Sequence, residues 1–205
     1  MLTALFDAVM ERRAGALAEQ VRAALPAEGP VLDLGSGTGH LAARLERELG
    51  VEVVPADVTD LHVVGRPPVP IADGVLPFAD GAFAAALLVF MLAYPREPAA
   101  LLAEAARVTR GPVVLVQTLH AGGAGYAWLR VREFVWTVVA FHASKLLGYV
   151  PRGARFTMGT RRFYTDAALR RDVGAAGLRV RAHRARAVLP GGALAVHTWV
   201  LERDA

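Results

Sequence analysis

The stretch VLDLGSGTGHLA, residues 31–42, predicts a short buried strand, a tight turn and the start of a helix. Its glycines, at 35, 37 and 39, have the spacing G-x-G-x-G, whereas dinucleotide-binding turns have the spacing G-x-G-x-x-G. Glycine tolerates the geometry of such a turn and lets a ligand lie against bare backbone. Asp33, just before the turn, would repel a pyrophosphate but attract an ammonium group. The turn therefore favours a nucleoside that carries an amino acid over NAD.

On both sides of this turn, apolar strands alternate with helical patterns. We expect helices over 3–25, 40–49, 98–110, 126–150 and 165–176, and strands over 31–34, 51–54, 71–72, 84–90 and 113–117. Two further strands, over 178–188 and 193–201, are joined by a Pro-Gly-Gly turn that permits a reversal. This order predicts an α/β fold with a doubly wound, mostly parallel sheet that ends in a hairpin.

The composition narrows the classes of function. The 205 residues fit a single domain, and the absence of cysteine excludes disulfides and thiolate chemistry. No cluster of histidines and carboxylates has the spacing of a metal site, so we expect no metal. The longest apolar runs are shorter than the about 20 residues of a membrane span, and no secretory signal is visible, which predicts a cytoplasmic protein. The net charge of +4 is modest, and we expect no nucleic-acid partner.

Further motifs follow the glycine turn in order. Asp57 ends the segment VEVVPAD, about as far beyond the glycines as the carboxylate that reaches ribose hydroxyls in related folds. The segments DGVLPF, residues 73–78, and LLAEAARV, residues 101–108, come next. As one ordered set these motifs resemble the class I S-adenosylmethionine-dependent methyltransferases, in the branch with the type 11 methyltransferase pattern. The likeness covers residues 28–118 well and 160–202 loosely.

The resemblance implies a Rossmann-like, seven-stranded, mostly parallel sheet with the last strand antiparallel, helices on both faces and a helical insertion after strand five. It also implies S-adenosyl-L-methionine as the cofactor and S-adenosyl-L-homocysteine as its product. Asp57 would then bind the ribose hydroxyls and Asp73 the adenine amino group, whereas Glu104 and Arg107 would hold their helix in place. The cofactor-binding set expected on this basis is Asp33, Gly35, Ser36, Gly37, Gly39, Asp57, Val58, Asp73, Gly74 and Val89.

Two departures from the family pattern leave the catalytic residues open. Phe83-Ala84 stands where the family has Phe-Asp, and Leu92-Ala93-Tyr94 replaces the polar residues that commonly follow the fourth strand. Ligands in such sheets lie outside the carboxyl ends of the strands, which selects candidates after strands four and five or in the segments that cover them.

The catalytic candidates are His120, Tyr94 and His142. His120 is the best base on chemical grounds, because the unperturbed pKa of histidine is near 6.5. The alternatives are that His120 is a solvated loop residue, that Tyr94 only forms a wall of the pocket, and that His142 is packed among apolar residues.

Two segments are expected to cover the site: an N-terminal helix within residues 1–27, and a helical insertion over 121–163. Aromatic residues of the insertion, with arginines at 152, 155, 161 and 162, suit a small hydrophobic, aromatic or lipid-like methyl acceptor with a polar or anionic end. They equally suit the core of a lid, a peripheral membrane contact or a homodimer contact. Competing functions are methylation of RNA or protein, and a non-methylating relative such as a pseudoenzyme or a cyclase.

Overall fold

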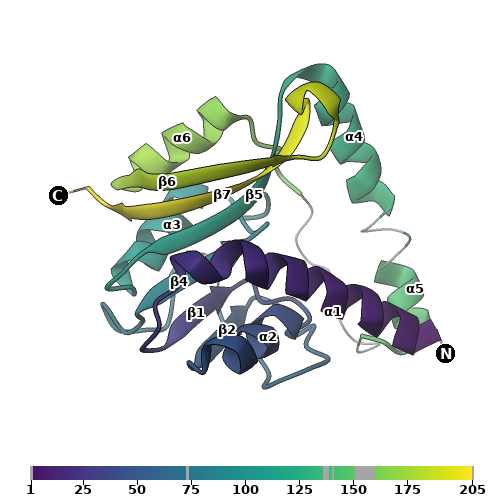
Figure 1. Cartoon of the computed structure of the whole chain (residues 1–205), viewed down its shortest axis with the longest axis horizontal. Helices are drawn as coiled ribbons and strands as arrows, with labels where there is room; N and C mark the ends of the chain where they lie inside the picture. Colours follow the sequence, from purple (N-terminus) through teal and green to yellow (C-terminus); the bar gives the residue numbers. More distant parts are fainter. Residues whose placement is uncertain (1, 73, 136–138, 140, 151–159, 205) are drawn as a thin grey trace.

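One seven-stranded sheet organises the chain, with the strand order β3-β2-β1-β4-β5-β7-β6 (Figure 1). The computed structural model describes residues 2–204 except 73, 136–138, 140 and 151–159. Strands β1 to β5 pair in parallel, whereas β7 runs antiparallel to both β5 and β6, which confirms the predicted fold class. The strands are β1 (Val31–Leu34), β2 (Val53–Asp57), β3 (Val69–Pro70), β4 (Ala85–Val89), β5 (Val113–His120), β6 (Leu178–Ala187) and β7 (Leu194–Arg203).

Helices cover both faces of the sheet. The buried residues of α1 and α2 pack in one apolar cluster on one face, and those of α3 and α6 pack in a second cluster on the other. The helices are α1 (Leu2–Val21), α2 (His40–Leu49), α3 (Pro98–Arg107), α4 (Gly122–Phe134), α5 (Phe141–Leu146) and α6 (Asp166–Ala175), with short 3₁₀ turns at Arg22–Ala24 and Pro190–Gly192. No helix among the described residues is long and apolar enough to cross a bilayer.

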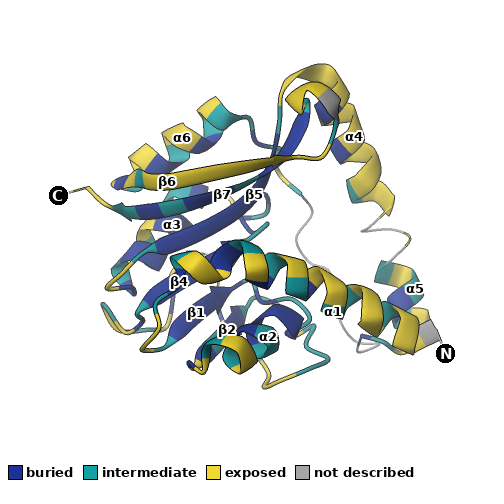
Figure 2. Ribbon diagram, in the orientation of Figure 1, coloured by how far each residue is buried: buried dark blue, intermediate teal, exposed yellow. Residues whose placement is uncertain are grey.

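The central strands are mainly apolar because helices shield them on both faces. All four residues of β1 are buried, as are most residues of β4 and β5 (Figure 2). Continuous apolar strands of this kind are typical of parallel sheets covered on both sides. The carboxyl ends of β1, β2 and β4 therefore emerge from a well-packed scaffold, which can hold functional side chains in place.

The segment after β5 differs from its prediction. Where a helix was predicted over 126–150, α4 begins earlier, at Gly122, and α5 ends at Leu146, whereas residues 136–138 and 140 between them lie outside the described residues. The early start has a steric reason: a Cβ on Gly125 would lie 2.0 Å from the carbonyl oxygen of Ala193, so glycine lets α4 pack closely against the chain before β7.

Candidate functional site

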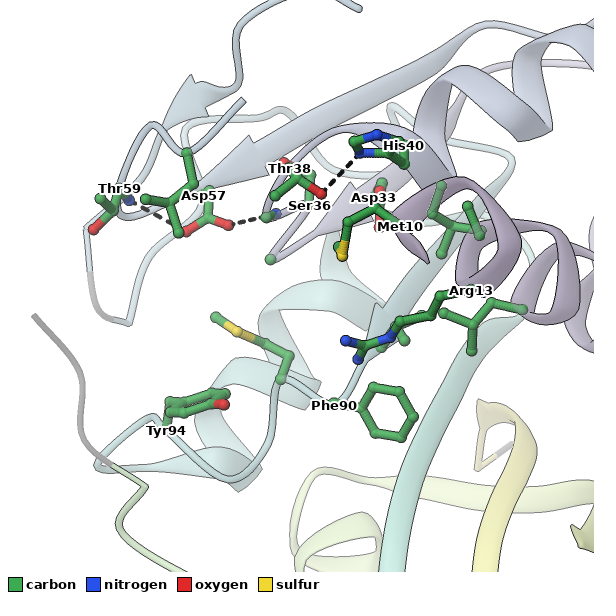
Figure 3. Close-up of a pocket in the computed structure, with 18 of the residues that line it drawn as sticks. Met10, Arg13, Asp33, Ser36, Thr38, His40, Asp57, Thr59, Phe90 and Tyr94 are labelled. Atoms are coloured by element: carbon green, nitrogen blue, oxygen red, sulfur yellow. Dashed lines mark hydrogen bonds between the residues drawn. The ribbon is translucent and has the colours of Figure 1, made fainter. Parts of the chain in front are cut away.

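A cavity lies at the carboxyl ends of β1, β2 and β4, beneath the middle of α1 (Figure 3). This is the edge at which open α/β sheets bind their ligands. Its lining combines the glycine turn after β1, the residues after β2 and β4, and one side of α1. The lining residues are Met10, Arg13, Ala14, Leu17, Asp33, Gly35, Ser36, Gly37, Thr38, His40, Leu41, Asp57, Val58, Thr59, Leu61, Val89, Phe90, Met91 and Tyr94.

The glycine turn presents its backbone to this cavity. Gly37 has a φ of +56°, and a Cβ added there would meet no atom within 4 Å, although Gly37 lines the cavity. Its N–H donates to Oδ2 of Asp57 at 2.9 Å. A side chain at this position would thus project into space that a ligand can occupy, so the turn has the form of a cradle for one.

Asp33 is a buried carboxyl group, and one of its oxygens lacks a hydrogen-bond partner in the described part of the protein. Its side chain is 2% exposed, and its Oδ2 has no hydrogen-bond partner among the described residues. Burial, and next the charge of Asp57, raise the pKa of Asp33 from 3.8 to about 7. An ammonium group placed beside it would stabilise the carboxylate, which is the chemistry expected of an amino-acid-bearing ligand.

Asp57 ends β2 and is fixed by backbone donors on both oxygens. Besides Gly37, the N–H of Thr59 donates to its Oδ1 at 3.2 Å. Burial raises the pKa of Asp57, and the hydrogen bond from Gly37 is the main opposing effect. The carboxylate is therefore already oriented at the edge of the cavity, next to Val58.

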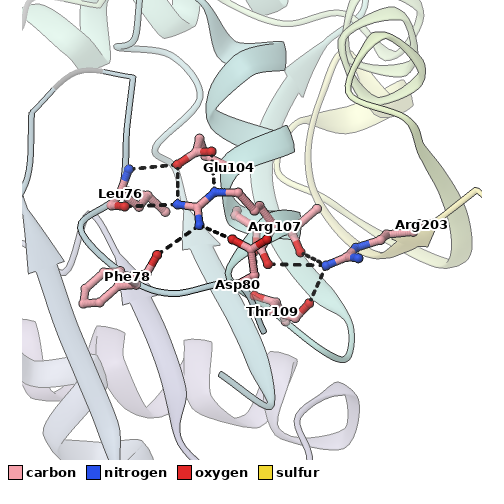
Figure 4. Close-up of polar contacts among 9 residues, drawn as sticks. Leu76, Phe78, Asp80, Glu104, Arg107, Thr109 and Arg203 are labelled. Atoms are coloured by element: carbon pink, nitrogen blue, oxygen red, sulfur yellow. Dashed lines mark hydrogen bonds and ion pairs between the residues drawn. The ribbon is translucent and has the colours of Figure 1, made fainter. Parts of the chain in front are cut away.

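The segment after Gly74 is held against α3 by the pair that the sequence assigned to a structural role (Figure 4). Arg107 donates to the carbonyl oxygens of Phe78 at 3.0 Å and of Leu76 at 3.1 Å, and Glu104 accepts the N–H of Leu76 at 3.0 Å. Arg107 also pairs with Glu104 and Asp80. These contacts confirm the structural role of Glu104 and Arg107.

Replacement of Arg107 by alanine is expected to loosen this segment, because two carbonyl groups and two carboxylates lose their shared donor. We expect a midpoint of thermal unfolding several degrees lower, and faster amide hydrogen exchange at Leu76 and Phe78. The matched control is Arg110→Ala. Arg110 is an exposed arginine just after the end of α3, and its replacement should leave both readouts unchanged. Equal effects of the two variants would contradict the bracing role.

The structure places the predicted cofactor residues in three groups. Asp33, Gly35, Ser36, Gly37, Asp57, Val58 and Val89 line the cavity. Gly39 and Gly74 do not line it: a Cβ on Gly39 would lie 2.3 Å from the carbonyl oxygen of Val64, so this glycine permits close packing of the turn instead. Asp73 lies outside the described residues.

Of the catalytic candidates, Tyr94 lines the cavity, whereas His120 and His142 do not. The Nδ1 atom of His120 lies 3.4 Å from the carbonyl oxygen of Gly122, and its ring packs against Tyr126. Burial is the largest cause that raises the pKa of Tyr94, and this keeps its hydroxyl protonated at neutral pH.

Among the cavity residues that were not foreseen from the sequence, two carry ionisable side chains, His40 and Arg13. His40 is 2% exposed and lies between Oδ1 of Asp7 and Oγ1 of Thr38, each at 3.0 Å from a ring nitrogen, and so joins α1 to the glycine turn. Arg13 lies further along α1 than Asp7, and its guanidinium lies over the ring of Phe90. Adjacency to Gly39 could have signalled His40, but no local pattern distinguishes Arg13 from Arg12 beside it.

Comparisons with known proteins agree with this architecture. A family profile described as a methyltransferase domain matches residues 6–183, which is most of the chain. None of the curated proteins matches the chain in sequence. Solved structures match at low identity and therefore show the fold alone.

Three of these structures cover nearly all of the chain. The geranyl diphosphate C-methyltransferase of Streptomyces coelicolor A3(2), solved with Mg²⁺, geranyl diphosphate and S-adenosyl-L-homocysteine, is 12% identical over 94% of this chain and 81% of its own, with a TM-score of 0.64. The [4+2]-cyclase SpnF is 15% identical over 95% and 82%, with a TM-score of 0.63. A chain from the complex of the Haloferax volcanii Trm112 methyltransferase activator with a putative methyltransferase is 16% identical over 96% and 94%, with a TM-score of 0.61. Because the family profile includes the glycine turn and extends from α1 into β6, the chain belongs to the methyltransferase-domain family. It is one of the class I proteins whose cofactor is S-adenosylmethionine.

Proposed function

We propose that the chain binds S-adenosylmethionine at the β1–β2 end of the cavity and methylates a small, mainly hydrophobic acceptor at the β4 end. The observation that carries the proposal is the unpartnered, buried Oδ2 of Asp33 beside the open backbone of Gly37. The first suits the ammonium group of the cofactor, and the second leaves space for it. Asp57 would hold the ribose hydroxyls, through a carboxylate already oriented by Gly37 and Thr59.

The other end of the cavity fits an apolar acceptor. Val89 ends β4, Phe90 and Met91 follow it, and all three line the cavity together with Met10 of α1. When bound, S-adenosylmethionine supplies a methyl group on a sulfonium, which is a reactive electrophile. The task of the protein is then to hold the acceptor in line with that group, so positioning carries most of the catalysis.

Tyr94 would contribute as a hydrogen-bonding wall of the acceptor site. Its raised pKa disfavours the phenolate, so Tyr94 is a poor general base at neutral pH. Both ring nitrogens of His40 have partners, Asp7 and Thr38, within the protein. Acceptors that need no strong base, such as an acidic phenol or a nucleophilic carbon or amine, suit this site best.

A second candidate is a reaction that keeps the cofactor intact, such as a cyclisation. The observation that favours it is that, among the described lining residues, none at the β4 end is a histidine or a carboxylate that could remove a proton from an acceptor. Methylation of RNA is less well supported, because the arginine-rich strand β6 lies at the sheet edge, separated from β4 by β5 and β7.

Calorimetric titration tests the cofactor part of the proposal. We expect S-adenosylmethionine and S-adenosylhomocysteine to bind at micromolar concentrations, and NAD and NADP not to bind, because the acidic side chains of Asp33 and Asp57 border the turn where a pyrophosphate would lie. Incubation with a panel of phenols, amines and prenyl-type compounds should then yield S-adenosylhomocysteine with at least one acceptor. Tight cofactor binding without any turnover would favour the second candidate, and no binding of either adenosyl ligand would overturn both.

A further inference from the structure

The cavity keeps its charges apart. The carboxylates Asp33 and Asp57 belong to the end formed by β1 and β2, whereas Arg13 extends from α1 toward Phe90 and Tyr94 (Figure 3). Among the described residues, neither carboxylate is one of the groups that shift the pKa of Arg13. Arg13 is therefore a charge of the β4 end, where the proposed function places the acceptor.

The guanidinium of Arg13 rests on a fixed platform. Its Cζ atom lies 5.4 Å from the centroid of the Phe90 ring, within the range of a cation–π contact. Phe90 has a φ of +56°, a left-handed conformation that is costly for a residue with a side chain and that clusters at functional sites. The N–H of Phe90 donates to the carbonyl oxygen of Val116 at 2.8 Å, which holds this backbone in place.

A second cation, Arg132 of α4, does not line the cavity but comes close to Arg13 from another segment. Arg132 of α4 lies near enough to Arg13 to lower its pKa, although desolvation is the larger cause. Desolvation likewise lowers the pKa of Arg132. Both side chains nevertheless stay open to solvent in this structure. Desolvation opposes both positive charges, whereas the nearby carboxylate of Glu133 favours that of Arg132, and an anion bound at Arg13 would offset the desolvation there.

The hydroxyl group of Tyr94 completes this cluster. Tyr94 lies close to both arginines and forms a hydrogen bond with Thr160, whose Oγ1 also donates to Glu133 of α4. The N-terminal helix, the loop after β4, α4 and the chain at residue 160 therefore converge on one point beside the cavity.

We propose that Arg13 and Arg132 form a subsite that binds an oxyanion, a carboxylate or a phosphate, carried by the methyl acceptor. This inference rests on the proposed function and narrows its substrate class from hydrophobic compounds to hydrophobic anions. A guanidinium suits this task because its planar fork donates two parallel hydrogen bonds to a carboxylate or a phosphate. Of the arginines assigned to the rim from sequence, Arg162 pairs with Asp172 at 3.7 Å and donates to the carbonyl oxygen of Arg96, whereas Arg152 and Arg155 lie outside the described residues.

The test uses the full chain saturated with S-adenosylhomocysteine and three probes that each contain eight carbon atoms. Octanoate, octyl phosphate and 1-octanol are titrated by calorimetry, so that the two anions are compared with each other and with a neutral analogue. We expect at least one anion to bind about 10-fold or more tightly than 1-octanol. We expect Arg13→Gln and Arg132→Gln each to weaken that anion by about 10-fold and to leave 1-octanol unchanged.

Matched controls lie on the same helices. Arg12→Gln on α1 and Arg130→Gln on α4 replace exposed arginines that neither line the cavity nor act on the pKa of Arg13, and both should retain wild-type affinity for every probe. Anions that bind no better than 1-octanol, or that lose equal affinity in the control variants, would overturn the subsite while S-adenosylhomocysteine still binds. Failure of S-adenosylhomocysteine to bind the wild-type chain would instead overturn the proposed function and the subsite with it.

Discussion

Replacement of Asp57 by alanine is expected to weaken the binding of S-adenosylhomocysteine by about 100-fold or more. In the proposed site, the carboxylate accepts hydrogen bonds from both ribose hydroxyls, and bonds to a charged group are each worth about 1.5–3 kcal/mol. The same carboxylate accepts the N–H groups of Gly37 and Thr59 in the ligand-free protein. Its removal therefore takes away ligand contacts and the brace of the glycine turn together. Isothermal calorimetry at fixed pH and salt measures the loss.

Asp60→Ala is the matched control for this variant. Asp60 belongs to the same loop, is exposed, accepts the N–H of His62 at 3.0 Å and does not line the cavity. We expect its affinity for S-adenosylhomocysteine to stay within about 3-fold of wild type. An Asp57→Ala protein that unfolds at the wild-type temperature and binds the ligand as tightly as Asp60→Ala would show that the ribose lies elsewhere.

The parts of the molecule that were predictable from sequence share one property: their signals are local. The glycine turn, the buried strands and the hairpin at the C-terminus each depend on residues that are neighbours in the chain. Thr165 is an example: it begins the helix predicted over 165–176, and its side chain caps α6 by accepting the N–H of Ala168 at 3.2 Å. Where the backbone geometry requires a particular residue type, that residue can be recognised in the sequence itself.

The unforeseen parts depend on contacts between distant segments. His40 acquires its role from Asp7 of α1 and from Tyr149, whose hydroxyl lies 3.3 Å from Nε2 of His40, and neither is near it in sequence. Arg13 acquires its role from Phe90 and Arg132. His120 is the opposite case. Its imidazole suggested a general base, but its position at the end of β5 leaves it outside the cavity. Residue type alone could not settle where these side chains point.

Replacement of Asp33 by asparagine is expected to have opposite effects on stability and on binding. The unfolded chain ionises Asp33 near pH 3.8, whereas the folded, ligand-free protein keeps it protonated until about pH 7. Folding therefore takes up a proton between these values, and stability falls as pH rises through that window before it levels off above pH 7. Asparagine has the same shape and carries no charge to desolvate. The wild-type chain should thus become less stable relative to Asp33→Asn as pH rises.

Between pH 5 and pH 8 we expect the free energy of unfolding of the wild type to fall by about 2–3 kcal/mol relative to Asp33→Asn, as measured by denaturant titration without ligand. At pH 8 the same variant should bind S-adenosylhomocysteine at least about 10-fold more weakly, because the ammonium group loses its carboxylate partner. Asp60→Asn, at an exposed aspartate, should show neither effect. A stability difference between wild type and Asp33→Asn that does not change with pH would mean that Asp33 is already ionised when the protein is ligand-free. If the expected trend is found, ionisation of the buried Asp33 destabilises the ligand-free protein, and the ammonium group of the bound cofactor offsets this destabilisation. Ligand binding and folding stability are then coupled through this one residue.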